Sequence, residues 1–361
     1  MATASPSKTE WMIYGANGYT GHLIAEEAVR RGMHPIVAGR SREEITKIAE
    51  QLGCRGRVFD LSTVERTRTH LADCQLVLNC AGPFSATSRP MIDGALAART
   101  HYLDITGEIA CLEAAAARHD EAATAGVALI PAVGFDVVPS DCLAAQVAAR
   151  VAEPTHLEMA IHSTGTLSAG TAKTMIEALP DGGRARIDGH IERVPAAWKV
   201  REIPFPAGPQ WAMTIPWGDV STAYHSTGIP NIEVYATAPR QTIKWIERLR
   251  FLAPIARPAL VQNWLKKLAE SRLPGPTEEQ RKTNRVLLWA RATGREKQVA
   301  EAVLETPEGY ALTVLTALGA VERLLATPPQ PGFSTPSRAF GSDFIEQFEG
   351  VSLQFHTPAT V

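Results

Sequence analysis

The sequence predicts an α/β fold: a doubly wound parallel sheet, then a second α+β domain on a mainly antiparallel sheet. Over the first 150 residues, short apolar runs alternate with segments of helical periodicity, as in parallel sheets with right-handed crossovers. From about residue 153, strand-like runs follow one another with turn signals between them. We expect four parts: a disordered N-terminus at 1–9, the parallel-sheet domain at 10–152, the second domain at 153–308, and C-terminal helices at 309–361 that return to the first domain.

The elements of the first domain are expected in strict alternation. Strands are predicted at Trp11–Tyr14, Pro35–Gly39, Arg57–Phe59, Gln75–Asn79, His101–Asp104 and Val127–Pro131. Helices are predicted at His22–Arg31, Arg42–Gln51, Thr63–Ala72, Pro90–Arg99 and Ile109–Ala125. Open parallel sheets bind ligands at the carboxyl ends of their strands, so the motifs that follow these strands are expected to converge at one edge.

A glycine-rich turn follows the first strand and opens the first helix. Gly15 permits the tight turn, Gly18 lets the backbone approach a pyrophosphate, and Gly21 lets the helix pack close to the strand. The helix N-terminus favours a negative charge. Strand, glycine turn and helix in this order predict a dinucleotide site. Its predicted cofactor-binding residues are Gly15, Asn17, Gly18, Tyr19, Thr20 and Gly21.

The residues after the second strand indicate the type of dinucleotide. NAD-binding sites usually place an acidic side chain here, whereas Arg40 is suited to the 2′-phosphate of NADP. Ser41 offers a further hydroxyl donor, and it is equally suited to cap the helix that follows. Arg42 is the weaker of the two arginine candidates. The sequence therefore predicts NADP(H) as the cofactor.

The remaining strand ends supply further cofactor-binding candidates. Asp60 is suited to approach the adenine or, alternatively, to cap a strand end. Cys80 lacks an accompanying His or Asp motif, so a small buried thiol is favoured over a nucleophile. Small residues after the fourth strand permit close approach of the backbone to the ribose and nicotinamide. The predicted residues at these ends are Asp60, Asn79, Cys80, Ala81, Gly82, Pro83, Phe84, Gly134, Phe135 and Asp136.

The second domain is expected to contain strands and one basic amphipathic region. Residues 242–272 carry tryptophans and leucines beside lysines and arginines, which suits a lipid contact or, alternatively, packing on the domain or on a homodimer partner. A strongly periodic helix is predicted at Ala311–Ala326. The segment Ile203–Trp217 is expected to separate strands. The predicted strands are Leu157–Ser163, Arg186–Arg193, Asn231–Thr237, Arg285–Ala292 and Ala300–Glu305.

Composition excludes several functional classes. The chain has 361 residues, 45% of them hydrophobic and 20% charged, with a net charge of −2, which gives no argument for nucleic-acid binding. Its five cysteines lack metal-binding spacing, so neither a metal site nor a disulfide framework is expected, and a cytoplasmic location is predicted. No secretory signal and no membrane-spanning window is expected.

Taken together, these motifs resemble the saccharopine dehydrogenase-like oxidoreductases, and most closely their trans-acting enoyl reductase subgroup. The resemblance implies an NADP(H)-binding Rossmann-type domain and, more weakly, reduction of a carbon–carbon or related double bond. Saccharopine enzymes must bind a dicarboxylic amino acid, and no matching set of arginines is evident. The motifs that carry the resemblance are Gly15–Gly21, Ala38–Arg40, Asn79–Phe84, His101–Glu108, Pro131–Asp141, Ser163–Thr166, Pro216–Asp219 and Ser226–Asn231.

Three functions are therefore compared. The first is an NADPH-dependent reductase of an apolar enoyl or polyketide/lipid-type acceptor, with a partner synthase as an open possibility. The second is an imine or amine oxidoreductase, and the third is a non-catalytic NADP-binding sensor. No tyrosine has a lysine four positions later, which disfavours the short-chain dehydrogenase mechanism. The candidate proton donors are Tyr102, Glu108 and Asp136, with Lys173 and His225 as weaker candidates and solvent as the alternative.

Overall fold

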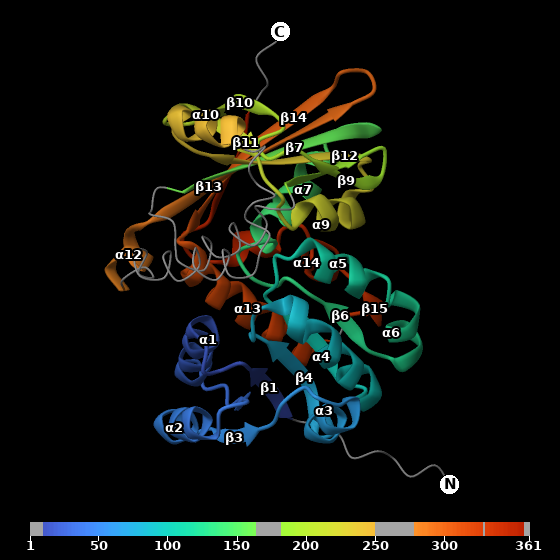
Figure 1. Ribbon diagram of the computed structural model, residues 1–361, viewed down its shortest axis with the longest axis vertical. Coiled ribbons are helices and arrows are strands. Elements are labelled where there is room, and N and C mark those ends of the chain that lie inside the picture. Colours follow the sequence, from blue (N-terminus) through green and yellow to red (C-terminus); the bar gives the residue numbers. More distant parts are fainter. Residues whose placement is uncertain (1–9, 164–181, 250–277, 328, 357–361) are drawn as a thin grey trace. The chain divides into compact units, whose positions relative to one another are not determined.

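The computed structural model describes residues 10–163, 182–249, 278–327 and 329–356. Contacts divide the chain into two compact units, one of residues 1–138 and 312–341 and the other of residues 139–311 and 342–361. Each unit contains one sheet (Figure 1). The predicted α/β class is confirmed. The expectations for residues 1–9, for Lys173 and for residues 250–272 lie outside the described residues.

The first unit is built on a parallel sheet of seven strands, in the order β15-β6-β5-β4-β1-β2-β3. The chain winds outward from β1 to β3, returns to β4 beside β1, and winds outward again to β6. The doubly wound topology predicted from the sequence is thus confirmed. The strands are β1 (Glu10–Tyr14), β2 (Ile36–Gly39), β3 (Arg55–Val58), β4 (Cys74–Asn79), β5 (His101–Asp104), β6 (Ala128–Ile130) and β15 (Gly332–Phe333).

Helices connect these strands at nearly the predicted places, with two corrections. The fourth helix begins at Phe84, six residues before the predicted start, and contains Pro90 in its interior. The predicted helix 109–125 is two helices, because Arg118 leaves the helical conformation and its guanidinium binds Asp93 and Glu121. The helices are α1 (Tyr19–Arg30), α2 (Arg42–Leu52), α3 (Val64–Leu71), α4 (Phe84–Ala98), α5 (Ile109–Ala116), α6 (His119–Ala125) and α14 (Pro336–Phe340).

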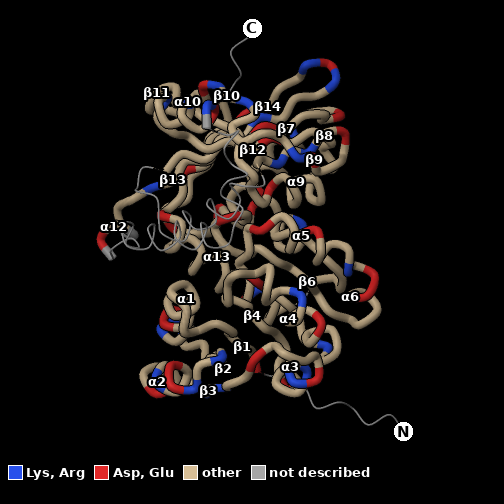
Figure 2. The backbone as a smooth tube through the Cα atoms, viewed as in Figure 1, with Lys and Arg blue, Asp and Glu red and all other residues tan. Residues whose placement is uncertain are grey.

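The central strands of this sheet are buried on both faces. In β1, Met12 and Ile13 point to opposite faces and neither is exposed to solvent. Continuous apolar runs of this kind are what parallel strands covered by helices require. Acidic and basic residues are interspersed on the outer helices, as α2 and α3 show (Figure 2).

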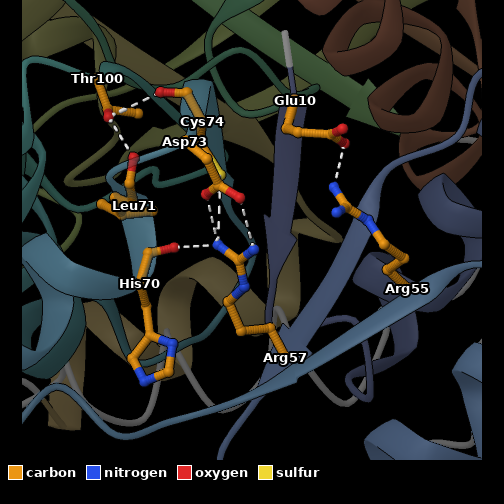
Figure 3. A network of polar contacts seen from close by, with 8 residues as sticks. All are labelled: Glu10, Arg55, Arg57, His70, Leu71, Asp73, Cys74 and Thr100. Atoms are coloured by element: carbon orange, nitrogen blue, oxygen red, sulfur yellow. Dashed lines mark hydrogen bonds and ion pairs between the residues drawn. The ribbon is translucent and has the colours of Figure 1, made fainter. Parts of the chain in front are cut away.

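One polar network fixes the edge of the sheet to α3 (Figure 3). From β3, the guanidinium of Arg57 donates to both carboxylate oxygens of Asp73, at 2.8 and 3.0 Å, and to the backbone oxygen of His70. These hydrogen bonds hold the pKa of Asp73 at about 2, below its ordinary value. The buried hydroxyl of Thr100 donates to the backbone oxygens of Leu71 and Cys74, at 3.0 and 2.9 Å. This network is structural and lies at the amino end of β4.

The second unit is built on a mixed, mainly antiparallel sheet of nine strands. Its main path is β10-β11-β12-β7-β13-β14-β16, and the β8–β9 hairpin joins at β12. Among the strand pairs formed by the described residues of this sheet, only β12–β7 is parallel. The strands are β7 (Pro154–Ser163), β8 (Gly183–Ile187), β9 (His190–Val194), β10 (Val200–Phe205), β11 (Gly208–Thr214), β12 (Asn231–Thr237), β13 (Arg285–Gly294), β14 (Val299–Pro307) and β16 (Ser352–His356). The helices are α7 (Val138–Ala148), α9 (Asp219–Thr227), α10 (Arg240–Leu249) and α12 (Glu278–Thr283).

Two segments of the second unit differ from the prediction. The expected strand 186–193 is a hairpin, because Asp188 and Gly189 turn the chain with positive φ angles of 48° and 84°. An Asp-Gly pair between apolar residues is a hairpin signal, so this turn was readable from the sequence. The segment 203–217, expected to separate strands, contains most of the β10–β11 hairpin. Its prolines Pro204 and Pro209 are tolerated at the end of this hairpin, at the margin of the sheet.

The C-terminal part of the chain is divided between the units. Helix α13 (Gly309–Ala326) contributes residues from 312 onward to the first unit, and β15 pairs with β6 there. Residues 342–361 belong to the second unit, where β16 pairs with β14, so the expectation that all of 309–361 returns to the first domain is wrong. Contrary to expectation, α13 is long and apolar enough to span a membrane by length and composition. Half of it is buried within the protein, as in the core helices of folded domains.

Candidate cofactor site

The glycine-rich turn leaves the N-terminus of α1 without a side-chain cap. Gly18 is the N-cap residue, no side chain caps it, and the first turn carries no acidic residue. The turn itself is closed by backbone hydrogen bonds, from Gly15 N–H to Ala38 O at 2.8 Å and from Gly18 N–H to Gly15 O at 3.0 Å. Among the described residues no side chain caps this N-terminus, and such a helix end suits an anionic ligand.

Close packing explains two of the three glycines. A Cβ on Gly21 would lie 2.3 Å from the backbone oxygen of Gly15, so only hydrogen fits between the helix and the turn. A Cβ on Gly15 would lie 2.7 Å from the backbone nitrogen of Ala81, and Gly15 has a φ of +86°. The glycine turn after β1 therefore rests directly on the segment after β4. These strands are neighbours on either side of the switch point, with Tyr14 opposite Asn79.

Arg40 lies exposed at the carboxyl end of β2 and forms no ion pair with any other described residue. Burial raises the pKa of Tyr14 to about 12, while the charges of Arg40 and Asp60 act on it in opposite directions. Both charges are therefore close to the end of β1. Ser41 caps α2 by accepting from Glu44 N–H at 3.4 Å, as one of its two predicted roles required.

Two polar residues beside this edge already have partners in the protein. Asn17 donates through Nδ2 to Glu44 Oε2 at 2.9 Å, which joins the glycine turn to the first turn of α2. Asp60 accepts from Ser62 N–H at 3.0 Å and pairs with Arg66 at 2.7 Å. These contacts fix the loop that follows β3, and both predicted roles of Asp60, as a strand-end cap and beside the adenine, stay predictions.

The segment Asn79–Phe84 is held at Ala81 by two side chains. Asn79 Oδ1 accepts from Ala81 N–H at 3.1 Å, and the hydroxyl of Thr87 donates to Ala81 O at 2.5 Å. A Cβ on Gly82 would meet nothing closer than 4.0 Å, so the backbone is accessible there. Cys80 is 8% exposed, and burial raises its pKa, so it is a buried thiol as favoured from the sequence.

Glu108 is used to cap a helix. Its Oε1 accepts from Phe84 N–H at 2.8 Å and its Oε2 from Ser85 N–H at 2.9 Å, at the N-terminus of α4. The thiol of Cys111 donates to Oε2 at 3.4 Å, and burial raises the pKa of this thiol to about 12. Both oxygens of this carboxylate are thus engaged by hydrogen bonds within the first unit, and the proton-donor role of Glu108 stays a prediction.

Tyr102 is fully buried and donates to Asp104 Oδ2 at 2.6 Å. The other oxygen of Asp104 accepts from Thr106 N–H at 3.0 Å and from Ala132 N–H at 2.7 Å. Asp104 thus joins the ends of β5 and β6, a role that the sequence analysis did not assign. Burial and this hydrogen bond raise the pKa of Tyr102 well above its ordinary value, which argues against Tyr102 as a proton donor.

Asp136 is the third candidate proton donor. Burial raises its pKa to about 6, although part of the residue reaches the surface. Its carboxylate lies against Gly107, where a Cβ would be 2.9 Å from Oδ2. The preceding residues are fixed to α13, because Phe135 N–H donates to the Thr313 hydroxyl at 3.0 Å. Asp136 thus has a pKa closer to neutrality than that of Tyr102.

We expect the buried Asp104 carboxyl to make stability pH-dependent. Burial, its largest influence, raises its pKa from 3.8 to about 6. The folded state therefore binds this proton more tightly than the unfolded state does. The contribution of protonated Asp104 to the free energy of unfolding is complete below about pH 4 and is lost as the pH rises through about 6. An Asp104→Asn variant removes the titration, and wild type should lose about 3 kcal/mol relative to it between about pH 4 and 7.

Urea denaturation of both proteins across this range would measure the difference. The exposed Asp120→Asn serves as the control and should track wild type at every pH. A stability difference between wild type and Asp104→Asn that is independent of pH would contradict the assignment.

Several residues of the sequence motifs form a polar core in the second unit. The hydroxyl of Ser140 donates to Asp219 Oδ2 at 2.9 Å, and the hydroxyl of Ser226 donates to Asp141. Asp141 and Asp219 are fully buried. These contacts join α7 to α9. Among the described residues, no cluster of His, Cys, Asp and Glu could hold a metal ion.

Topology and turn geometry together define a dinucleotide-binding protein with a second, mainly antiparallel domain. Comparison with known proteins is more specific. Residues 11–130 match the family model of the saccharopine dehydrogenase NADP binding domain. The first unit is therefore similar to the NADP-binding domain of saccharopine dehydrogenase, and the predicted cofactor and family resemblance are confirmed.

Relatives in sequence and in structure agree with this family. The trans-acting enoyl reductase of Mycobacterium bovis is 30% identical over 192 residues, 48% of this chain and 46% of the relative. That of Mycobacterium leprae is 34% identical over 159 residues, 41% and 38% of the two chains. The chain spans about half the length of the curated relatives it matches. Saccharopine dehydrogenase (L-Glu forming) from Saccharomyces cerevisiae has the same fold, with a TM-score of 0.64 at 12% identity over 97% of this chain and all of that one.

Proposed function

We propose that the protein is an NADPH-dependent reductase that transfers hydride to an apolar enoyl or polyketide/lipid-type acceptor. The main observation behind this proposal is that the glycine turn, the segment Asn79–Phe84 and Arg40 lie at the same edge of the sheet, at its switch point. There the uncapped N-terminus of α1 lies beside the segment Asn79–Phe84, and Gly15 is in direct contact with Ala81. The neighbouring strand β2 ends at the same edge, and Arg40 follows it. Arg40 forms no ion pair within the described part of the chain.

The chain's residues fit the cofactor in their chemistry. The glycine turn Gly15–Gly21 offers backbone donors to a pyrophosphate, and Arg40 with Ser41 offers charge and a hydroxyl to a 2′-phosphate. Reduced nicotinamide, when bound, supplies the hydride. The protein must orient the acceptor and supply a proton, and Asp136 is the proposed donor because its pKa lies near 6. Reduction of an enoyl group adds the hydride to one alkene carbon and this proton to the other.

The engagement of three arginines within the second unit is consistent with an enoyl acceptor rather than a dicarboxylic amino acid. Arg201 is paired with Glu158, and Arg291 lies 3.5 Å from Glu301. Arg186 is buried and donates to the backbone oxygens of Val220 and Gly189, at 2.9 and 2.7 Å. These three arginines are already engaged within the protein, whereas an amino-acid dehydrogenase needs guanidinium groups directed at substrate carboxylates.

The proposal is tested by measuring NADPH oxidation with a series of trans-2-enoyl thioesters, both free and attached to a carrier protein. We expect turnover that rises with acyl chain length, because an apolar site gains affinity from each methylene. Turnover only with a 2-oxo acid and an amine would support the imine or amine oxidoreductase instead. Tight NADPH binding without turnover on either series would support the sensor.

The name of the relatives, trans-acting enoyl reductase, suggests that the acceptor of this protein is delivered by a separate synthase. A small apolar substrate and this synthase are therefore the proposed partners. The homodimer, the lipid contact of residues 242–272 and the cytoplasmic location stay predictions. Within the described part of that segment, Trp245 is 60% exposed on α10.

A further inference from the structure

Glu108 contacts the N-terminus of α4. The two partners are far apart in sequence, yet both carboxylate oxygens are used, at 2.8 and 2.9 Å from the amide nitrogens of Phe84 and Ser85. The N-cap position of α4 is Pro83, which offers no side-chain hydrogen bond. Glu108 thus supplies from another element the cap that the local sequence lacks.

Glu108 is itself fixed in place. Its backbone N–H donates to the Thr106 hydroxyl at 3.1 Å, and Thr106 N–H donates to Asp104 Oδ1 at 3.0 Å. The thiol of the buried Cys111 donates to Glu108 Oε2. The carboxylate is therefore attached to the buried end of β5, a rigid part of the first unit.

The segment that Glu108 holds is the one that contacts the glycine turn. Ala81 is bound through its N–H by Asn79 and through its oxygen by Thr87, and its backbone lies against Gly15. The two residues between Ala81 and the capped Phe84 are therefore fixed from both sides. Without the Glu108 cap, the Phe84 and Ser85 amides would lose their acceptors, and the Pro83 end would keep only the hydrogen bonds that its backbone oxygen accepts from Ala86 N–H and the Thr87 hydroxyl, at 3.1 and 3.4 Å.

We propose that Glu108 is a positioning residue, which sets the Ala81–Pro83 backbone for the nicotinamide half of NADP(H). This inference rests on the proposed function, since it assigns the segment to the nicotinamide. It predicts a selective effect. Changes at Glu108 weaken the binding of ligands that carry nicotinamide and spare those that end at the adenosine phosphates.

Isothermal titration with two probes tests this selectivity. NADPH carries both halves of the cofactor, whereas 2′,5′-ADP carries the 2′-phosphorylated adenosine alone. We expect Glu108→Ala to weaken NADPH binding about tenfold and Glu108→Gln, which keeps one acceptor oxygen, about threefold. Affinity for 2′,5′-ADP should be unchanged in both variants. Asp120→Asn, an exposed carboxylate on α6, is the matched control and should affect neither ligand.

Each outcome decides the proposal. Equal loss of both ligands would mean that Glu108 supports the fold of the whole site, and unchanged NADPH affinity would mean that the cap has no consequence for nicotinamide. Either result overturns the positioning role. If Glu108→Ala does not fold, Glu108→Gln decides alone. Because only binding is measured, these failures are distinct from failure of the proposed reductase function, which appears as absent turnover in the wild-type protein.

Discussion

Replacing Gly21 with alanine should lower the free energy of unfolding by about 2–3 kcal/mol and weaken NADPH binding by more than about tenfold. The added Cβ would lie 2.3 Å from the Gly15 oxygen and 3.0 Å from its carbonyl carbon. Both are backbone atoms of the turn and cannot rotate away as the end of a side chain could. Either α1 or the turn must move, and each forms part of the proposed pyrophosphate site.

The direction of the stability change is what makes this variant informative. Gly21 is helical, and in an open helix a glycine-to-alanine change stabilises by about 0.5–1 kcal/mol. A loss of stability therefore measures the close approach of α1 and the turn directly. Urea unfolding and NADPH titration give the two quantities.

Gly32, just after the C-terminus of α1, provides the control. Its φ is +76°, and no atom lies within 4 Å of an added Cβ. Gly32→Ala should therefore cost about 1 kcal/mol from backbone strain, with NADPH affinity unchanged. A Gly21→Ala protein as stable as wild type, with the same affinity, would show that the helix and turn are not packed as the structure has them.

Local signals predicted the parallel sheet well because its central strands are short, apolar and separated by helices. The glycine turn and Arg40 were readable for the same reason, since each is defined by a few adjacent residues after a strand. The two-residue strand β15 and the largely exposed strand β16 carry no such pattern. Their positions are set by pairing with β6 and β14, and distant pairing has no local signature.

The roles of the acidic residues of the site also depend on distant contacts that have no local signature. Asp60 and Asp104 each lie where a predicted strand ends, yet one is exposed in a loop and the other is almost fully buried in a hydrogen-bonded network. The start of α4 was placed at Pro90 because nothing beside Phe84 signals a cap. That cap comes from Glu108, 24 residues later. Roles that depend on tertiary contacts can be recognised only from the three-dimensional structure.

Replacing Arg40 with alanine should weaken NADPH binding by about 10- to 100-fold and leave NADH binding unchanged. A charge-assisted hydrogen bond contributes about 1.5–3 kcal/mol, and only NADPH carries the 2′-phosphate that Arg40 is proposed to bind. Arg40 is exposed and forms no ion pair with another described residue, so its loss should change stability little. Titration of both cofactors against tryptophan fluorescence measures the preference.

Arg42→Ala is the matched control, because it removes the same charge two residues later, in the first turn of α2. It should reduce NADPH affinity far less than Arg40→Ala. Arg40→Lys should fall between wild type and Arg40→Ala, since lysine keeps the charge and loses the planar pair of donors. Added salt should reduce the wild-type preference for NADPH and have little effect on Arg40→Ala. Equal losses for NADPH and NADH would assign Arg40 to the fold of the turn, and the 2′-phosphate would then need another cation.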